Sequence, residues 1–145
     1  ELYWKGEKYA ISSSALSGMN LFFGKAKCSI CHNGPRFTDD HFHNIGVSFT
    51  QTAEKDVGRN KVTGELFHLR AFKTPGLLYV SRTAPYMHDG SLDTLEEVVE
   101  FYDLGGDDDP LKSPFISPIG LTTIEKQDIV EFMKALDRKE SSYEK

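Results

Sequence analysis

Cys28-Ser29-Ile30-Cys31-His32 is the stretch that decides the fold of this 145-residue chain. In a Cys-x-x-Cys-His run, two thiols can bond the two vinyl groups of a haem while the next residue ligates its iron. The motif therefore predicts a c-type cytochrome with one covalent haem c. Cys28 and Cys31 would hold the porphyrin, and His32 would ligate the iron on its proximal face.

The two cysteines could also form a disulfide, a zinc site or a thiol redox centre. The sequence has no third cysteine, so a zinc site would have to recruit His32 together with His41 or His43 at an unusual spacing. A thioredoxin-type redox centre is expected near a βαβ pattern, whereas residues 33–40 form a polar stretch rich in turn-forming residues. Haem attachment therefore explains the motif better than these alternatives.

The size and charge of the chain limit its class. A chain of 145 residues is long enough for one core, so we expect one mono-haem domain over residues 1–145, with residues 1–13 as an N-terminal extension. The net charge is −5 at pH 7, and two haem propionates would add to it. This charge argues against nucleic acid binding and favours partners with a basic docking face.

The sequence also bears on the location of the protein. No apolar run approaches the roughly 20 residues of a membrane helix, and Glu1 to Lys5 do not form a signal peptide. Covalent haem attachment takes place on the outer side of the bacterial inner membrane. We therefore expect a periplasmic protein without a membrane span, from which any leader has been removed.

Helix signals precede the motif and end the chain. Residues 14–23 carry apolar side chains at helical spacing after a serine-rich start. Capping boxes at Thr94–Glu97 and Thr122–Glu125 predict a helix over about 94–104 and another after residue 122. The apolar face of the last helix consists of Ile129, Phe132, Met133 and Leu136.

The middle of the chain has few such signals. Residues 33–85 contain no long periodic segment, and the acidic, proline-rich residues 107–118 are expected to be solvated surface. Such a chain needs an apolar body to fold around, which a haem supplies. The predicted fold class is therefore mainly α: a cytochrome c fold with long loops around one covalently attached haem.

The iron needs a second axial ligand. Met87 is the best candidate, because its loop is bounded by proline and glycine and has enough chain to reach around the ring. His88 is the rival, while Met19 and Met133 stand on expected helix faces and are better explained as core residues. From the residues alone, an ordinary loop methionine explains Met87 equally well. The other candidates are His41, His43 and His68.

Cationic side chains could pair with the haem propionates. Arg59 and Arg82 are candidates, since a guanidinium matches the fork of a carboxylate. Further candidates are Arg70 and Lys73. We also expect His32 to donate its other ring N–H to a backbone carbonyl within residues 33–36, which would fix the ring orientation.

Several longer motifs resemble one family. They are CSICHNGPRFTDDHFHNIG at residues 28–46, DVGR at 56–59, AFKTP at 71–75, TAPYMHDGSL at 83–92 and TLEEVVEFY at 94–102. In this order they are similar to the C-terminal haem domain of bacterial di-haem cytochrome c peroxidases and their MauG relatives. The resemblance covers nearly the whole chain from about residue 14.

The resemblance implies a cytochrome c fold whose haem transfers electrons. It makes His32 the proximal and Met87 the distal ligand of the iron. The MauG branch has a tyrosine where Met87 stands, so this chain follows the peroxidase pattern there. A thioether ligand stabilises ferrous iron and raises the reduction potential, which suits a site that receives electrons.

The resemblance leaves the activity open. Family enzymes carry two haems and reduce peroxide at the haem of the N-terminal domain, whereas this chain has one attachment motif. The chain is then either a mono-haem electron carrier, or a fragment or subunit of a di-haem peroxidase whose peroxidatic haem lies outside it. A haem gas sensor is a weaker alternative.

The expected partners and ions follow from the same resemblance. The partners would be redox proteins: a small cytochrome, a cupredoxin, or a di-haem or other oxidoreductase subunit. The calcium ion that the family binds between its domains is not expected, because half of its environment is absent.

Overall fold

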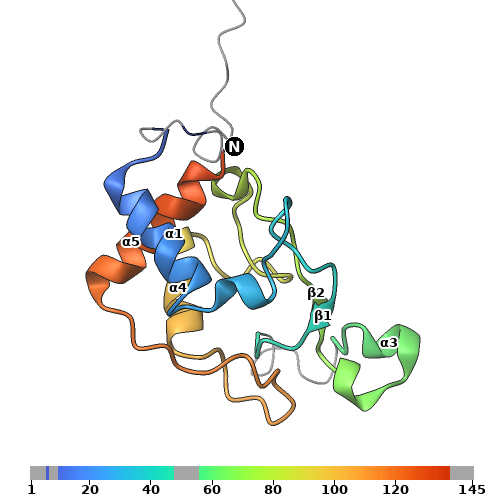
Figure 1. Cartoon of the computed structure of the whole chain (residues 1–145). Helices are drawn as coiled ribbons and strands as arrows, with labels where there is room; N and C mark the ends of the chain where they lie inside the picture. The colour runs from blue at the N-terminus through green and yellow to red at the C-terminus, as the bar shows by residue number, and fades with distance from the viewer. Residues whose placement is uncertain (1–5, 7–9, 48–55, 138–145) are drawn as a thin grey trace, which may run out of the picture.

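The computed structural model describes residue 6, residues 10–47 and residues 56–137, so most of the expected N-terminal extension lies outside it. The described part is helix-rich with a two-stranded sheet (Figure 1), which confirms the mainly α class. The elements are α1 (Ser13–Phe23), η2 (Cys28–Ile30), β1 (Phe42–His43), α3 (Asn60–Thr63), η3 (Leu66–His68), β2 (Phe72–Lys73), η4 (Val80–Arg82), α4 (Leu95–Asp103) and α5 (Thr123–Ala135).

The longer helices begin at the side chains that the sequence indicates. The hydroxyl of Ser12 caps α1 by accepting a hydrogen bond from the N–H three residues on, at 3.1 Å. Both expected capping boxes form, Thr94 with Glu97 at the start of α4 and Thr122 with Glu125 at the start of α5. These side chains bind N–H groups that the first helical turn leaves without an intrahelical partner.

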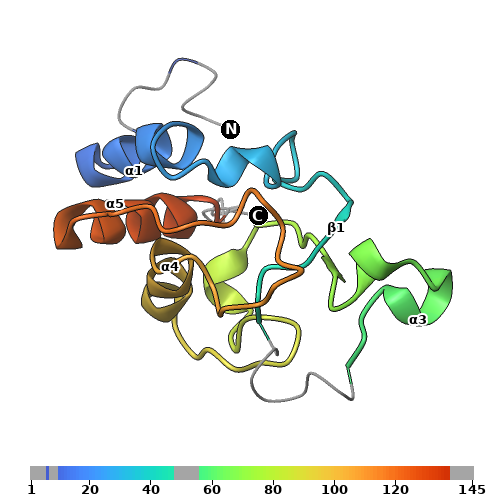
Figure 2. The same ribbon diagram turned by 90° about the horizontal axis from the view of Figure 1, so that it is seen from below.

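Helix α5 lies between α1 and α4 and packs mainly on α1 (Figure 2). The two helices approach closely at Gly18, where a Cβ atom would overlap the carbonyl oxygen of Asp128. The Ser14 hydroxyl also donates a hydrogen bond to the Asp128 carboxylate. On the predicted apolar face of α5, Ile129, Phe132 and Met133 are buried.

Aromatic contacts connect this helical core to the Cys-x-x-Cys-His motif. The ring of Phe22, which is 2% exposed, lies edge-on to Phe132 at 5.2 Å and to Phe37 at 6.1 Å between centroids. Such edge-to-face pairs stabilise a core beyond their buried area. They hold the end of α1 and the loop after the motif against α5.

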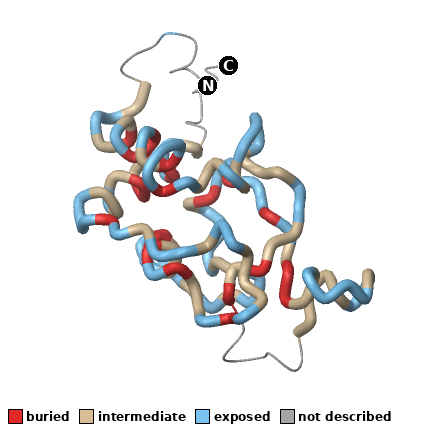
Figure 3. The backbone as a smooth tube through the Cα atoms, turned by 60° about the horizontal axis from the view of Figure 1, so that its bottom comes forward, coloured by how far each residue is buried: buried red, intermediate tan, exposed pale blue. Residues whose placement is uncertain are grey.

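The other side of the molecule is built from the sheet and a small lobe. Strand β1 pairs antiparallel with β2, and His43 lies opposite Phe72. The lobe that carries α3 is joined to the sheet by a bridge between Gly58 and Ala71, and it is exposed over much of its length (Figure 3). In the part of the chain described, no helix is long and apolar enough to cross a bilayer.

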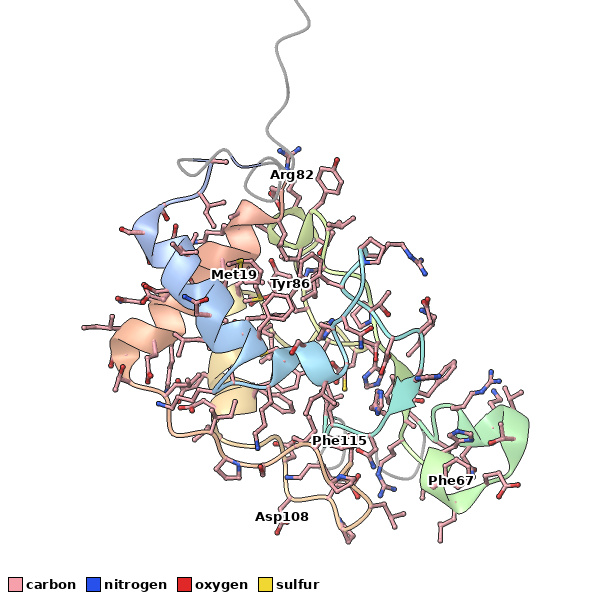
Figure 4. The ribbon with its side chains drawn as sticks, in the orientation of Figure 1. Met19, Phe67, Arg82, Tyr86, Asp108 and Phe115 are labelled. Atoms are coloured by element: carbon pink, nitrogen blue, oxygen red, sulfur yellow. The ribbon has the colours of Figure 1, made fainter. Side chains whose placement is uncertain are left out.

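The expectation that residues 107–118 are solvated surface is wrong at Asp109. Asp108 is exposed at the outer edge of the molecule (Figure 4), but Asp109 is only 4% exposed. Its carboxylate accepts two hydrogen bonds from the Arg70 guanidinium, with Nε–Oδ2 at 2.6 Å and Nη2–Oδ1 at 2.8 Å. The loop turns inward because this buried pair ties it to the segment before β2.

We predict that Gly18→Ala destabilises the protein. The added Cβ overlaps the backbone of α5, so α1 and α5 must move apart, and overpacking of this kind costs about 1–3 kcal/mol. Ser17→Ala, at an exposed neighbouring position of the same helix, is the matched control and should be neutral or slightly stabilising. Urea unfolding of both variants with haem bound measures the difference, and equal midpoints would contradict the close approach.

The Arg70–Asp109 pair should make stability depend on pH in the acid range. Burial raises the pKa of Asp109, but hydrogen bonds from Arg70 and Asn44 outweigh it and lower the pKa from 3.8 to about 2. Because the folded-state pKa is the lower one, the stabilisation is complete above about pH 4 and is lost as the pH falls through about 2. At 1.36 kcal/mol per pKa unit, it amounts to about 2 kcal/mol.

Urea unfolding between about pH 5 and pH 2 tests this dependence. The free energy of unfolding should fall with acid more steeply in the natural protein than in Asp109→Asn, which has no carboxylate to protonate at this position. Identical slopes in the two proteins would contradict the assignment.

Candidate haem site

A cavity of about 530 Å³ lies between α1, α4, α5 and the loops around the sheet. Its size falls in the range of roughly 300–1,000 Å³ that is typical of cofactor sites. Cys28, Cys31, His32 and Met87 all line it. The cavity therefore brings the attachment motif and the expected distal ligand to one place.

The local backbone explains how the motif reaches the cavity. Helix α1 ends at Gly24, and Lys27 adopts a left-handed conformation that starts the turn η2. The N–H groups of Cys31 and His32 both donate to the carbonyl oxygen of Cys28, at 3.3 and 2.9 Å. This tight turn gathers both sulfur atoms and the imidazole at the end of α1.

The His32 ring is oriented for metal binding. Its Nδ1 lies 3.0 Å from the carbonyl oxygen of Phe37, and since a carbonyl only accepts, Nδ1 carries the proton and Nε2 keeps its lone pair. Burial lowers the pKa of His32, which keeps the imidazole neutral at pH 7. The carbonyl lies one residue beyond the predicted range 33–36, because the chain turns at Gly34 and brings Phe37 back over the ring.

The two thiols are free and protonated at neutral pH. Burial raises the pKa of Cys28 to about 12 and that of Cys31 to about 11. Within residues 10–47 and 56–137, the one cluster of metal-binding side chains is Cys31, Asp39 and His43. The zinc site considered from the sequence, which uses both cysteines, is not assembled there.

Met87 stands in a loop that is fixed on both sides. The Tyr86 N–H donates to the carbonyl oxygen of Leu92 at 2.6 Å, and the Tyr86 hydroxyl donates to the carbonyl oxygen of Val80 at 3.0 Å. Met87 itself has a φ of 68°, a left-handed conformation that costs a residue with a side chain about 1–2 kcal/mol.

The rival histidines have other contacts. The His88 ring stacks on Phe72 with centroids 3.4 Å apart, and its Nε2 lies 3.1 Å from the Asp56 carboxylate. His43 also lines the cavity, but its Nε2 is 2.8 Å from Asp39. These contacts favour Met87 over the histidines as the second ligand. His41, with 80% of its side chain exposed, and His68 do not line the cavity.

The arginines expected near the propionates are not among the residues that line the cavity. The Arg59 guanidinium lies 4.6 Å above the Phe42 ring. Arg82 Nε lies 3.2 Å from Asp137, and its side chain points outward (Figure 4). Their pairing with propionates therefore stays a prediction. The cations that do line the cavity are Lys25, Lys27 and Lys73.

Two parts of the cavity wall were not expected from the sequence. Tyr102 lines the cavity from α4, and burial together with the two cysteines raises its pKa. The sequence could have indicated this position, because Tyr102 follows the apolar pair Val98 and Val99 by one helical turn. Residues 115–119 also line the cavity. A proline interrupts this stretch, so it has no hydrophobic periodicity from which a place in the cavity wall could be predicted.

Comparison with known proteins agrees with this geometry, although no family model matches the chain. The chain is 36% identical to the cytochrome-c peroxidase IdrP1 of Denitromonas iodatirespirans, over 93% of the chain and 43% of that protein. It is 41% identical to the methylamine utilization protein MauG of Methylorubrum extorquens, over 90% of the chain and 36% of that protein.

A solved structure has the same fold. The crystal structure of a MauG-like protein associated with microbial copper homeostasis superposes with a TM-score of 0.82 at 32% identity, over 89% of this chain and 48% of that one. The di-haem peroxidase BthA from Burkholderia thailandensis, at 21% identity and a TM-score of 0.71, shares the fold.

The helix-rich fold and the cavity at a Cys-x-x-Cys-His turn define a protein of the cytochrome c type. The chain belongs to the family of di-haem cytochrome c peroxidases and MauG, which confirms the resemblance noted in its motifs. It spans less than half the length of the curated relatives that it matches.

We predict that the natural protein carries one haem that denaturation does not release. Its intact mass in denaturing solvent should equal that of the chain plus one haem, because thioether bonds survive unfolding. In Cys28→Ser/Cys31→Ser any bound haem should separate from the chain in acidified solvent. A natural protein that loses its haem in that solvent would contradict thioether attachment.

Proposed function

We infer that this chain is a mono-haem c-type cytochrome domain that transfers electrons through a six-coordinate iron. Cys28 and Cys31 would bind the haem covalently, and His32 and Met87 would ligate the iron. The observation that carries the proposal is that all four residues line one cavity of cofactor size. When bound, the haem supplies an iron that changes between ferric and ferrous states.

The residues around the cavity suit this role. His32 presents a neutral ring with Nε2 available, since Phe37 accepts the Nδ1 proton. Met87 offers a soft thioether, which favours ferrous iron and raises the potential. If His32 and Met87 both bind the iron, electrons would pass without exchange of ligands, and the two side chains would keep small molecules off the iron.

The family and the motif support proposals for the extent, the location and the partners of the domain. We propose one domain over residues 1–145, located in the periplasm, where haem c attachment occurs. Its partners would be redox proteins, either a small cytochrome or cupredoxin or a di-haem or other oxidoreductase subunit. For the propionates, Arg59 and Arg82 stay proposed partners, and the three lysines of the cavity wall are closer alternatives.

A second function has its own support. Because the chain spans less than half of relatives that are named cytochrome-c peroxidases, it could supply the electron-accepting half of a di-haem peroxidase. Peroxide would then be reduced at an iron outside this chain. The isolated domain with haem bound should reduce hydrogen peroxide no faster than free haem does, whereas rapid turnover would assign the peroxidase activity to this chain itself.

The sharpest test of the ligand set is Met87→Ala. The natural protein should show low-spin spectra, a ferric-sulfur charge-transfer band and no response to carbon monoxide. Met87→Ala should open the sixth position, lower the potential and bind carbon monoxide when reduced. Met133→Leu is the matched control, because Met133 also lines the cavity and the swap conserves volume; its spectra should not change.

Two results would contradict the proposal. Unchanged ligation in Met87→Ala would exclude Met87 as the ligand. Binding of carbon monoxide by the natural protein would instead indicate a labile Met87 and favour a gas sensor.

A further inference from the structure

Three loop segments wall the haem cavity, and one buried polar cluster joins them. The cluster consists of Asn44, Arg70 and Asp109, which are 3%, 6% and 4% exposed. The wall residues that these segments contribute are His43, Ile45, Val47, the run from Phe72 to Leu77 and the run from Phe115 to Ile119. None of the three cluster residues lines the cavity itself.

The Asp109 carboxylate is the centre of the cluster. Arg70 binds it with two parallel hydrogen bonds, at 2.6 and 2.8 Å, a bidentate geometry that fixes direction as well as distance. Asn44 Nδ2 donates to the same carboxylate at 2.8 Å and to the carbonyl oxygen of Leu69 at 3.2 Å. The Leu111 N–H adds a fourth donor at 2.8 Å. The carboxylate is therefore fully bonded from three separate segments.

Backbone contacts continue the connection towards the cavity. The Ser113 N–H donates to the carbonyl oxygen of Asn44 at 2.8 Å. Gly46 lies so close to Asp107 that a Cβ atom would stand 2.7 Å from its carbonyl oxygen. Phe115 follows two residues after this junction and stands at the cavity wall (Figure 4). The position of Phe115 and Ile116 thus depends on the junction, whereas Ile119 is held separately by an N–H bond to the carbonyl oxygen of Asp103 at 3.0 Å.

We propose that Arg70 and Asp109 are positioning residues that hold Phe115 and Ile116 over the haem and so help to set its reduction potential. This inference rests on the proposed function, because it requires a haem in the cavity. The physical reason is that the apolar shell around a metal controls the access of water. Water stabilises the more highly charged ferric state, so a loosened wall lowers the potential.

The variants are chosen so that an effect of lost positioning can be distinguished from an effect of lost stability. Removing one partner of a buried ion pair leaves an uncompensated charge, so Asp109→Asn alone is expected to be strongly destabilised. Replacing both partners by apolar side chains removes the directional bonds without leaving a buried charge unpaired. Arg70→Met/Asp109→Leu is therefore the informative variant, although Asn44 and the Leu111 N–H lose an acceptor and some stability is lost with it. Ser12→Ala, which removes the N-cap of α1 at the end of the helix away from the motif, is the control for destabilisation alone.

The experiment is redox titration of the haem-bound proteins with a mediator. Arg70→Met/Asp109→Leu should shift the one-electron equilibrium towards ferric iron by roughly three- to tenfold, a tenfold change being 59 mV. Its spectra should keep the His/Met pattern. Ser12→Ala should lower stability and keep the natural potential.

The outcomes distinguish this inference from the proposed function. If the natural protein lacks a His/Met spectrum, the proposed function fails first. If that spectrum is present and the double variant titrates like the natural protein, the positioning role is wrong. An equal shift in Ser12→Ala would also overturn it, because the effect would then follow from destabilisation.

Discussion

The structure is arranged around one cavity of about 530 Å³. Its wall is contributed by α1, α4, α5 and by the loops around the sheet. A cofactor bound there would bury apolar surface of all these segments at once, and burial of apolar surface is the dominant favourable term in folding. The helices α1, α4 and α5 form a small core of their own. The Cys-x-x-Cys-His motif at the end of α1 lies at the cavity.

The sequence predicts the local parts of this structure well. The starts of α1, α4 and α5 follow from side chains that bond N–H groups within the same turn, and such signals need no knowledge of the rest of the chain. The motif is also a local signal, whereas Met87 was singled out mainly by the family resemblance, and the structure brings them to one cavity. The carbonyl that orients His32 was missed by one residue, because it depends on how the chain turns at Gly34.

Contacts between distant segments could not be predicted. Arg70 and Asp109 are 39 residues apart in the chain, and neither residue carries a local sign that it is buried with the other. An arginine near a haem motif suggests a propionate partner, and an aspartate in an acidic, proline-rich loop suggests solvent. Both expectations rest on average behaviour of residue types, which a single bidentate pair in the fold overrides.

The two proposed axial ligands are held differently, and this difference bears on what a bound iron could do. The His32 ring is anchored by the Phe37 carbonyl, and Phe37 itself packs on Phe22 in the helical core. Met87 stands on a loop that the hydrogen bonds of Tyr86 close. Phe37 and Met87 both have a left-handed backbone, so the two positions differ in packing and not in backbone strain. If Met87 is the second ligand, the loop from Tyr86 to Leu92 would therefore decide between electron transfer through a closed iron and chemistry at an open one.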